Sequence, residues 1–400
     1  MVPMPRADRF PLQQGHAAWQ IRILIALTKA RGRSQISGDG RDLRLDVCRG
    51  LALWFVFIDH IPGNAFDWLT IRNYGFSDAS EVFVFVSGYT CMVSYGGTLR
   101  SRGWPTVIAR SLRRSFEIYV AFLLLVIIYL VLAWLSGSYL DETNTKHFFN
   151  DPGTALVHLL ALQYAPVNTD ILPTFVILHL AFPLVLWLMA RNAAIALAAS
   201  FMLYLMVQLY SWQMPAWPTG ELYFNPFAWQ VLFVVGACCA GPGAPYFAAF
   251  LRHRGTIPLA AAYVLFSLIV VLSWRVDAFK WLVPQMIEGW LYPIYKSHLD
   301  PARLIHFLAI VVLLTRFVPP GGHRPPGPWM KALIRCGENS LSVFCFSVLA
   351  SFVAFVILNR VSDGLPMQAA VSALGIAFMI TIANLFTWEA KLDRRGPALF

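Results

Sequence analysis

The sequence predicts an all-α fold, a polytopic bundle of about ten transmembrane helices with both termini in the cytoplasm. The 400-residue chain is 58% hydrophobic and only 13% charged, and its mean hydropathy is +0.59. Many of its apolar runs reach the length of about 18 residues that a bilayer requires. The alternating segments of a membrane β-barrel are lacking. These observations exclude a soluble domain.

We expect ten spanning helices, near residues 44–62, 79–97, 116–136, 171–190, 193–210, 227–243, 257–275, 302–318, 338–358 and 367–388. Together they form one membrane domain over 41–390, with no repeat and no soluble second domain. Residues 1–40 form a basic cytoplasmic arm, whose apolar stretch 19–27 suits either an interfacial helix or an unstructured segment. Residues 391–400 form a cytoplasmic tail.

The basic residues predict the topology. The chain has 31 Lys and Arg and a net charge of +10. With the N-terminus in the cytoplasm, most of these residues fall on the cytoplasmic side, among them Arg110, Arg113 and Arg114 in one loop. Positive residues favour that side. The charge therefore indicates membrane loops in contact with lipid headgroups, and no nucleic-acid partner is predicted.

The most unusual stretch is 46–89, which reads as two apolar helices joined by a polar link. Pro62, Gly63 and Asn64 favour the end of the first helix. Asp78 and Glu81 resemble a capping box at the start of the second. Ionisable groups this close to the membrane interior are costly, so they indicate a function.

His60 is the main candidate for chemistry. An imidazole can act as a base near neutral pH or can carry an acyl group. The alternative is an interfacial histidine that only hydrogen-bonds a loop. Neighbouring charges favour the catalytic interpretation: Asp46, Arg49, Asp59, Arg72, Asp78 and Glu81.

A histidine base is assisted by a carboxylate that orients the ring. Glu81 is the expected partner of His60, and Asp59 is the competing one. Adjacent helical residues point about 100° apart, so Asp59 can face Arg72 instead. Simple charge pairing within the hairpin is the alternative role of both acids.

Arg49 lies eleven residues before His60. Eleven residues end about 20° past three turns and span roughly 16 Å, so both side chains share one helix face. Arg49 and Asp46 can pair at the cytoplasmic end. Arginine binds phosphate with two parallel hydrogen bonds. Both residues are therefore candidates for binding a phosphate-bearing substrate that acts as the donor of a transferred group. An interfacial arginine is the alternative.

Candidates for binding the second substrate, the acceptor of the transferred group, lie on the opposite side of the membrane. They include aromatic residues suited to sugar stacking, although such residues also form interfacial belts. Lys296 belongs to a polar cluster with His298, Asp300 and Arg303 that can bind an anion or anchor a helix. The candidates are Asn64, Arg72, Asn73, Trp229, Trp290, Tyr292 and Lys296. The histidines lack metal-ligand spacing, so no metal is predicted.

Several motifs resemble a known family. LDVCRG followed by His60, and SEVFVFVSGY at 80–89, resemble the membrane acyltransferase-3 superfamily. The pattern over 41–89 is most similar to the OpgC branch, as are NPFAWQ, KSHLDPARLIHFLA and GENSLSVFCFSV. The resemblance covers roughly residues 41 to 390. Glu81 stands where related sequences often have Asp.

The resemblance implies a bacterial inner-membrane, multi-pass acyltransferase. It would use cytoplasmic acyl-CoA, in that family succinyl-CoA, as co-substrate without a separate cofactor, and a periplasmic glucan as acceptor. His60 would be the base or acyl carrier, and Arg49 would support the CoA side. The residues leave open succinyl or acetyl, direct transfer or acyl-histidine, and the oligomeric state. The rival is a transporter with His60, Asp59 and Glu81 as a proton path.

Overall fold

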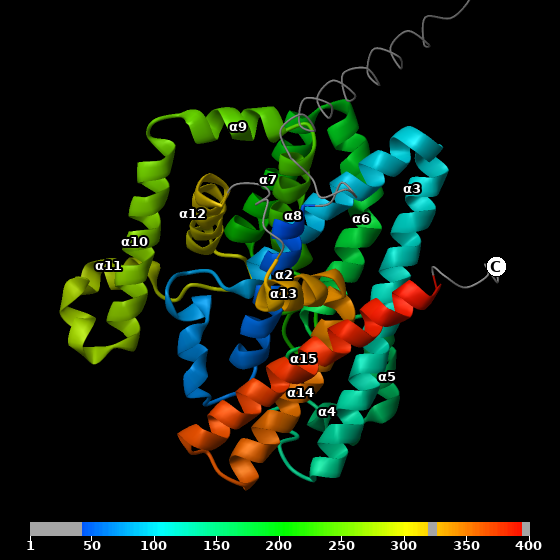
Figure 1. The fold of residues 1–400 in the computed structure, drawn as a ribbon, viewed down its shortest axis with the longest axis vertical. Coiled ribbons are helices and arrows are strands. Elements are labelled where there is room, and N and C mark those ends of the chain that lie inside the picture. Colours follow the sequence, from blue (N-terminus) through cyan, green and yellow to red (C-terminus); the bar gives the residue numbers. More distant parts are fainter. Residues whose placement is uncertain (1–41, 319–325, 394–400) are drawn as a thin grey trace, which may run out of the picture.

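The computed structural model describes residues 42–318 and 326–393. The expected arm at 1–40, with its candidate interfacial helix, and most of the expected tail lie outside these ranges. The described residues form helices joined by loops and contain no strand, only an isolated bridge between Pro215 and Glu221. The all-α prediction is confirmed (Figure 1).

The α-helices and 3-10 helices have these bounds: α2 Leu43–Asp59, η1 Ala65–Leu69, η2 Ile71–Asn73, α3 Ala79–Ser136, α4 Lys146–Asn150, α5 Pro152–Leu160, α6 Ile171–Arg191, α7 Ala193–Tyr210, α8 Pro226–Ala240, α9 Ala244–Arg252, α10 Thr256–Arg275, η3 Asp277–Leu282, α11 Gln285–Leu291, α12 Pro301–Phe317, α13 Pro328–Glu338, α14 Ser340–Arg360 and α15 Leu365–Asp393.

Six described helices are long and apolar enough to cross a membrane, namely α3, α6, α7, α10, α14 and α15. The bent pair α8 and α9 makes a seventh if it counts as one span, with 88° between its halves. The helices α2 and α12 are shorter, at 17 residues each. The multi-pass character is therefore clear, while the count of ten stays a prediction.

The helix α3 contains two of the expected spans. Its backbone is non-helical at Gly103, where φ is +78°, and Pro105 follows. Glycine adopts a positive φ at little cost because it has no Cβ. The chain therefore turns at Gly103, and residues before and after the turn line one pocket, described below.

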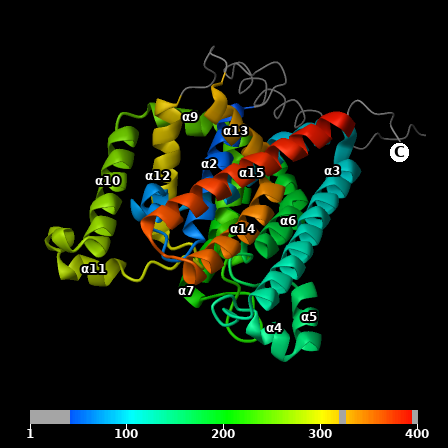
Figure 2. The same ribbon diagram turned by 60° about the horizontal axis from the view of Figure 1, so that its bottom comes forward.

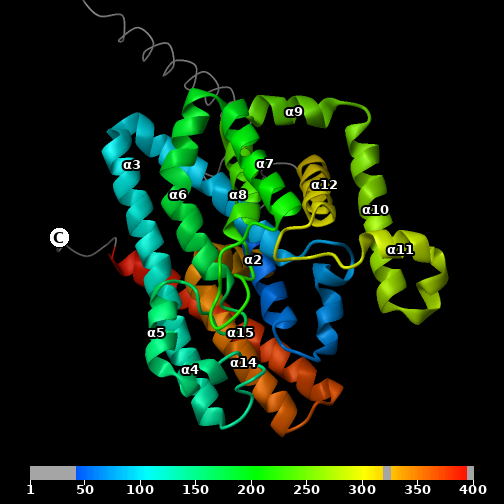
Figure 3. The same ribbon diagram turned by 180° about the vertical axis from the view of Figure 1, so that it is seen from behind.

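The helix α2 lies inside the bundle. It packs against α3, α13 and α14, while α3 also packs against α6 and α8. Seen from behind, α6, α7 and α8 cover one face and α14 and α15 lie on the other (Figure 3). Figure 2 places α9 and α13 at one end of the bundle and α4, α5 and α11 at the other.

Two glycines bring α3 and α8 into close contact. A Cβ on Gly88 would collide with the backbone of Phe233, and one on Gly236 would collide with the backbone of Phe85. Small residues let helices approach closely within a membrane. This contact holds the first half of α3 rigidly, and that half carries side chains of both pockets described next.

Candidate functional site

Two cavities lie along α2 and α3. The histidine pocket, of about 590 Å³, contains His60 in its lining. The arginine pocket, of about 520 Å³, contains Arg49 in its lining. Phe83 of α3 and Phe344 of α14 line both cavities. These two rings therefore stand where the pockets adjoin.

The helix α2 contributes to both cavities. Arg49 lines the arginine pocket, and Val56, Asp59 and His60 line the histidine pocket. At about 1.5 Å per residue, eleven residues separate Arg49 and His60 by roughly 16 Å along the helix. An elongated ligand that occupied both pockets would contact one residue near each end.

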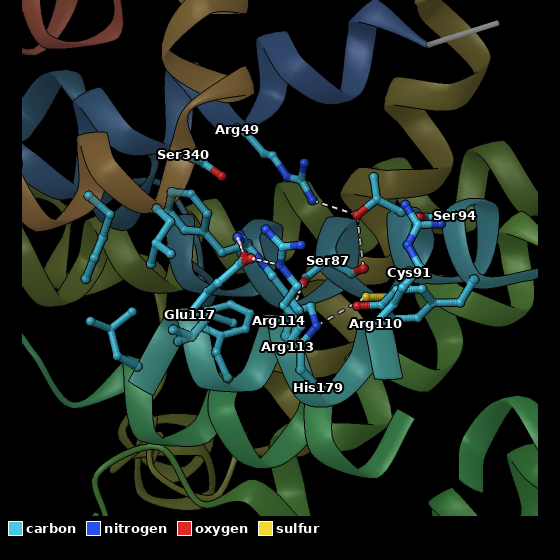
Figure 4. A pocket seen from close by; sticks show the side chains of 18 of the residues that line it. Arg49, Ser87, Cys91, Ser94, Arg110, Arg113, Arg114, Glu117, His179 and Ser340 are labelled. Atoms are coloured by element: carbon cyan, nitrogen blue, oxygen red, sulfur yellow. Dashed lines mark hydrogen bonds and ion pairs between the residues drawn. The ribbon is translucent and has the colours of Figure 1, made fainter. Parts of the chain in front are cut away.

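The arginine pocket is strongly basic. Arg49 enters from α2, and Arg110, Arg113 and Arg114 enter from the second half of α3 on the opposite side (Figure 4). Arg113 and Arg114 both bond to Glu117, at 3.0 and 3.1 Å. Glu338 is the second lining acid. Since four guanidinium groups face two carboxylates, the pocket is suited to a polyanion.

Small polar side chains line the inner wall of the arginine pocket. Arg49 Nη2 donates to Thr90 Oγ1 at 2.7 Å and to the Val86 carbonyl at 3.3 Å. His179 lies 3.2 Å from Ser87 Oγ through Nε2 and 3.6 Å from Cys91 Sγ through Nδ1. The lining of the arginine pocket thus contains small polar groups in addition to its arginines.

In the histidine pocket, His60 is the residue that ends α2. Its backbone N–H donates to the Val56 carbonyl at 3.0 Å. Its Nδ1 is buried and has no hydrogen-bond partner among the described residues. A buried ring nitrogen without a partner is unfavourable unless a ligand completes it.

Asp59 and Arg72 line the same pocket. Thr70 Oγ1 donates to Asp59 Oδ1 at 2.7 Å. Arg72 Nη1 points to the backbone carbonyl of Asp59 at 3.4 Å. Asp59 therefore faces the link between α2 and α3, and Arg72 lies beside it.

The structure corrects the expected pairing of Glu81 with His60. Glu81 is fully buried, and its Oε1 accepts a hydrogen bond of 2.8 Å from Arg303 Nε. Its Oε2 accepts from the Asp78 backbone N–H at 2.9 Å, which completes the expected capping box. Glu81 lines neither pocket. Both carboxylate oxygens are occupied by partners other than His60.

Asp78 lines the histidine pocket and is linked to Glu81 through Arg303. Arg303 Nη2 lies 3.0 Å from Asp78 Oδ2, and Lys296 Nζ lies 2.7 Å from the same oxygen. We call this series, Glu81–Arg303–Asp78–Lys296, the ion ladder. Burial alone would raise the pKa of Asp78, but Lys296 and Arg303 hold it well below its usual range. Asp78 is therefore ionised at neutral pH.

Two further charged residues line the histidine pocket, Asp170 at the start of α6 and Arg275 at the end of α10. Burial raises the pKa of Asp170 to about 7. Within residues 42–318 and 326–393, neither Arg72 nor Arg275 has a carboxylate at ion-pair distance. The pocket thus contains two arginines that have no carboxylate within 4.0 Å in the part of the chain that the structure describes.

Three of the expected acceptor-binding residues have structural roles instead. Asn64 is buried and bonds to Ser372 Oγ at 3.0 Å. Asn73 is buried and donates to the Asp67 carbonyl at 2.7 Å. Trp229 is buried, and its Nε1 donates to the carbonyls of Lys296 and Ser297. None of the three lines a pocket, so in this conformation they position loops rather than contact a ligand.

The remaining candidates divide between pocket and surface. Arg72 and Lys296 line the histidine pocket. Trp290 in α11 and Tyr292 just after this helix are exposed, by 87% and 66%. Asp46 is buried where α2 meets α13 and lines neither pocket. It therefore lies at the contact between these two helices rather than facing a cavity.

Sequence reasoning did not assign Asp170, Arg275, Phe83 and Phe344 to a site. Arg275 ends an apolar helix, where a basic residue is expected for topology alone. Phe83 and Phe344 are ordinary apolar residues in their helices. Arg303 was noticed only as part of a polar cluster. An arginine within the first turn of an apolar helix was the one available signal of a buried acid nearby.

Comparison with known proteins gives one match. The model of a family described as OpgC protein matches residues 41–391. Searches of curated proteins and of solved structures give no match. The matched range contains both pockets, the ion ladder and every described helix except the last residues of α15.

Proposed function

The chain belongs to the OpgC protein family, and from this premise we propose that it is an integral-membrane O-acyltransferase. It moves an acyl group from acyl-CoA to hydroxyl groups of a periplasmic glucan. It lies in the bacterial inner membrane with both termini in the cytoplasm, since most basic residues then lie inside. In this orientation the arginine pocket opens toward the cytoplasm and the histidine pocket toward the periplasm.

The adjoining pockets carry this proposal. Acyl-CoA has an anionic nucleotide at one end and a reactive thioester at the other, joined by a long arm. The arginine pocket suits the nucleotide phosphates. The polar wall of Ser87, Thr90 and His179 suits the amide-bearing arm, and His60 lies beyond the two phenylalanines. The order of basic and polar groups along the two pockets therefore supports acyl-CoA as the donor.

His60 is the proposed base. A hydroxyl of the acceptor loses its proton to the imidazole, and its oxygen attacks the thioester carbonyl. The C–S bond then breaks, and the CoA thiolate takes the proton from the imidazolium. In the acyl-histidine route, the imidazole itself attacks and the sugar hydroxyl attacks in a second step. Both routes yield a glucan ester and free CoA.

The charges of the histidine pocket favour succinyl as the acyl group. Succinyl carries a second carboxylate, which needs cationic partners in a membrane-embedded site. Arg72 and Arg275 line this pocket with no carboxylate at ion-pair distance among the described residues. The raised pKa of Asp170 keeps part of its population neutral near pH 7. An acetyl group has no carboxylate and would form no ion pair with either arginine.

The acceptor glucan would approach from the same end as α11. Tyr223 lines the histidine pocket, and the exposed rings of Trp290 and Tyr292 lie on the α11 lobe beside α10 (Figure 1). Aromatic faces bind the apolar faces of sugar rings while their polar atoms remain hydrated. These rings are proposed to hold the polymer outside the pocket while one hydroxyl enters.

The contacts give little support to the transporter alternative. A proton path through His60, Asp59 and Glu81 would require these groups to exchange protons with one another. Glu81 is instead bonded to Arg303 and to the Asp78 backbone, and Asp59 to Thr70. Because each of these acids is bonded to a separate partner, the arrangement favours a structural role for them over a proton-transfer path.

The test uses the purified full-length protein in lipid nanodiscs. Succinyl-CoA and a glucan are added, free thiol is measured, and radiolabelled succinate is followed into the polysaccharide. Wild type is expected to release one CoA per ester formed. His60→Ala should remain in the membrane and lose both signals, while His253→Ala, an exposed histidine on the loop after α9, should retain them. Full transfer by His60→Ala would remove the assignment.

A further inference from the structure

We propose that Lys296 is a catalytic residue whose ammonium group stabilises the negative charge that develops on the thioester carbonyl oxygen. The inference rests on the proposed acyl transfer and adds a role that differs from acceptor binding. Its basis is the ion ladder, which begins in the protein core and ends at a pocket-lining cation.

The ion ladder runs from the protein core to Lys296, which lines the histidine pocket. Exposure rises along it, from 0% for the side chain of Glu81 through 10% for Arg303 and 15% for Asp78 to 25% for Lys296. Each contact is 3.0 Å or shorter. Acidic and basic side chains alternate along the series, so each member contacts a residue of opposite charge type.

The backbone of Lys296 is also held in place. Trp229 Nε1 donates to the carbonyls of Lys296 and Ser297 at 3.2 and 3.1 Å. The Asn225 backbone N–H donates to Ser297 at 3.2 Å. The ammonium lies 5.3 Å from the centroid of the Phe224 ring, a cation–π contact. A lysine held at its backbone and at its ammonium group has lost the conformational freedom that normally weakens it as a catalyst.

Lys296 shares the pocket with His60. An ammonium has three N–H donors, and Asp78 is the ion-pair partner of Lys296 among the described residues. Two donors therefore remain for a ligand oxygen. Preorganised donors in a site of low dielectric constant are worth far more than donors in water.

The step balances without another reactant. When the acceptor oxygen attacks, the carbonyl π electrons move to oxygen and form a tetrahedral oxyanion. Lys296 donates hydrogen bonds to this oxyanion and keeps its own proton. The electrons return as the C–S bond breaks, and His60 transfers the acceptor's proton to the departing CoA sulfur. Lys296 ends the cycle as it began, with Asp78 as its counter-ion.

Asp78, Arg303 and Glu81 are positioning residues in this scheme. Asp78 alone would compete with the oxyanion for the ammonium. Because Arg303 shares the same Asp78 oxygen, the carboxylate is divided between two cations and holds Lys296 less tightly. Glu81 in turn fixes Arg303. Glu81 and Arg303 therefore weaken the hold of Asp78 on the Lys296 ammonium, which leaves this ammonium able to bind the substrate oxygen.

The test is Lys296→Met, assayed for thiol release and glucan labelling with succinyl-CoA and with acetyl-CoA. We expect kcat to fall about 10²- to 10³-fold with both donors, while KM for donor and for glucan changes less than about threefold. Lys146→Met is the matched control, because Lys146 forms a similar 2.9 Å pair with Asp141 on the surface. Its kinetics should equal those of wild type.

Three results would overturn the inference. A loss seen only with succinyl-CoA would make Lys296 a ligand of the distal carboxylate. A loss confined to the glucan KM would make it an acceptor contact, and unchanged kinetics would remove any role. Wild type without thiol release would instead defeat the proposed function itself. If Lys296→Met does not fold, Asp78→Asn decides: kcat should fall about tenfold at constant donor KM, and an unchanged kcat would refute the scheme.

Discussion

Arg303 Nε donates a hydrogen bond of 2.8 Å to Glu81 Oε1, across 222 residues of sequence. This contact joins the first turn of α12 to the first turn of α3 at a point where the Glu81 side chain has no exposure. Asp78, the N-cap of α3, accepts from the same guanidinium. The start of α3, which shapes the histidine pocket, is thus fixed by a cation from a distant helix.

The first prediction concerns stability. Arg303→Met leaves Glu81 buried and without its cation, and such a loss costs about 3–5 kcal/mol. We expect a clearly lower thermal unfolding midpoint in nanodiscs. The control is Glu117→Gln, because the side chains of Glu117 and its partner Arg114 are about 40% exposed, and pairs of this kind contribute about 0–1 kcal/mol.

The double variant Arg303→Met with Glu81→Met provides the sharper comparison. Replacing a buried ion pair by apolar side chains of similar volume is often neutral. It should therefore unfold at a higher temperature than Arg303→Met alone. Equal midpoints for the single and double variants would show that Glu81 does not depend on this arginine.

Local sequence patterns predicted the parts of the site that lie within one helix or one hairpin. The capping box of Asp78 and Glu81 was readable because it needs only a fixed spacing. The placement of Arg49 and His60 along α2 followed from the helical period. Each of these features depends on neighbours within about a dozen residues, and periodicity describes such neighbours well.

Contacts between distant segments could not be read in the same way. Glu81 was expected to serve His60, and it pairs with Arg303 instead. Trp229 was a candidate for contact with the acceptor, and it is buried against the Lys296 backbone. Nothing in one sequence indicates which helix lies beside which, so a polar residue can be recognised as costly without its partner being known.

The second prediction concerns the donor. Arg49→Ala and Arg114→Gln each remove a guanidinium from the arginine pocket. Hydrogen bonds to charged groups contribute about 1.5–3 kcal/mol, so the donor KM should rise about tenfold or more, with a smaller change in kcat. Arg252→Gln is the control, because Arg252 is an exposed residue at the end of α9.

The same variants should lose sensitivity to salt. Screening weakens binding between a polyanion and a basic pocket, so the wild-type KM should increase with ionic strength more steeply than that of Arg49→Ala. If wild type and both variants bind acyl-CoA equally well at low and high salt, the nucleotide does not occupy this pocket.

The third prediction concerns acyl selectivity. Arg72→Gln and Arg275→Gln each remove one of the two histidine-pocket arginines that have no carboxylate at ion-pair distance among the described residues. The ratio of kcat/KM for succinyl-CoA over acetyl-CoA should fall about tenfold for each, while the value for acetyl-CoA stays near wild type. Arg191→Gln, on the exposed end of α6, should leave the ratio unchanged. Equal losses with both donors would assign these arginines to the acceptor or to folding.

The fourth prediction concerns the rings between the pockets. Phe83 and Phe344 line both cavities, so we expect them to limit the passage of water to a bound thioester. Phe83→Ala or Phe344→Ala would widen the connection. Thiol release in the absence of glucan should then increase several-fold, and the yield of glucan ester per CoA released should decrease.

The matched control is Phe85→Ala, two residues away on α3. Phe85 is buried against Phe307, with 5.5 Å between ring centroids, and lines neither pocket. Its truncation creates a cavity of similar size and similar cost. If Phe85→Ala hydrolyses acyl-CoA as fast as Phe83→Ala, the leak reflects general loosening of the bundle. A leak specific to Phe83 and Phe344 means that the thioester crosses between the cavities at these two rings.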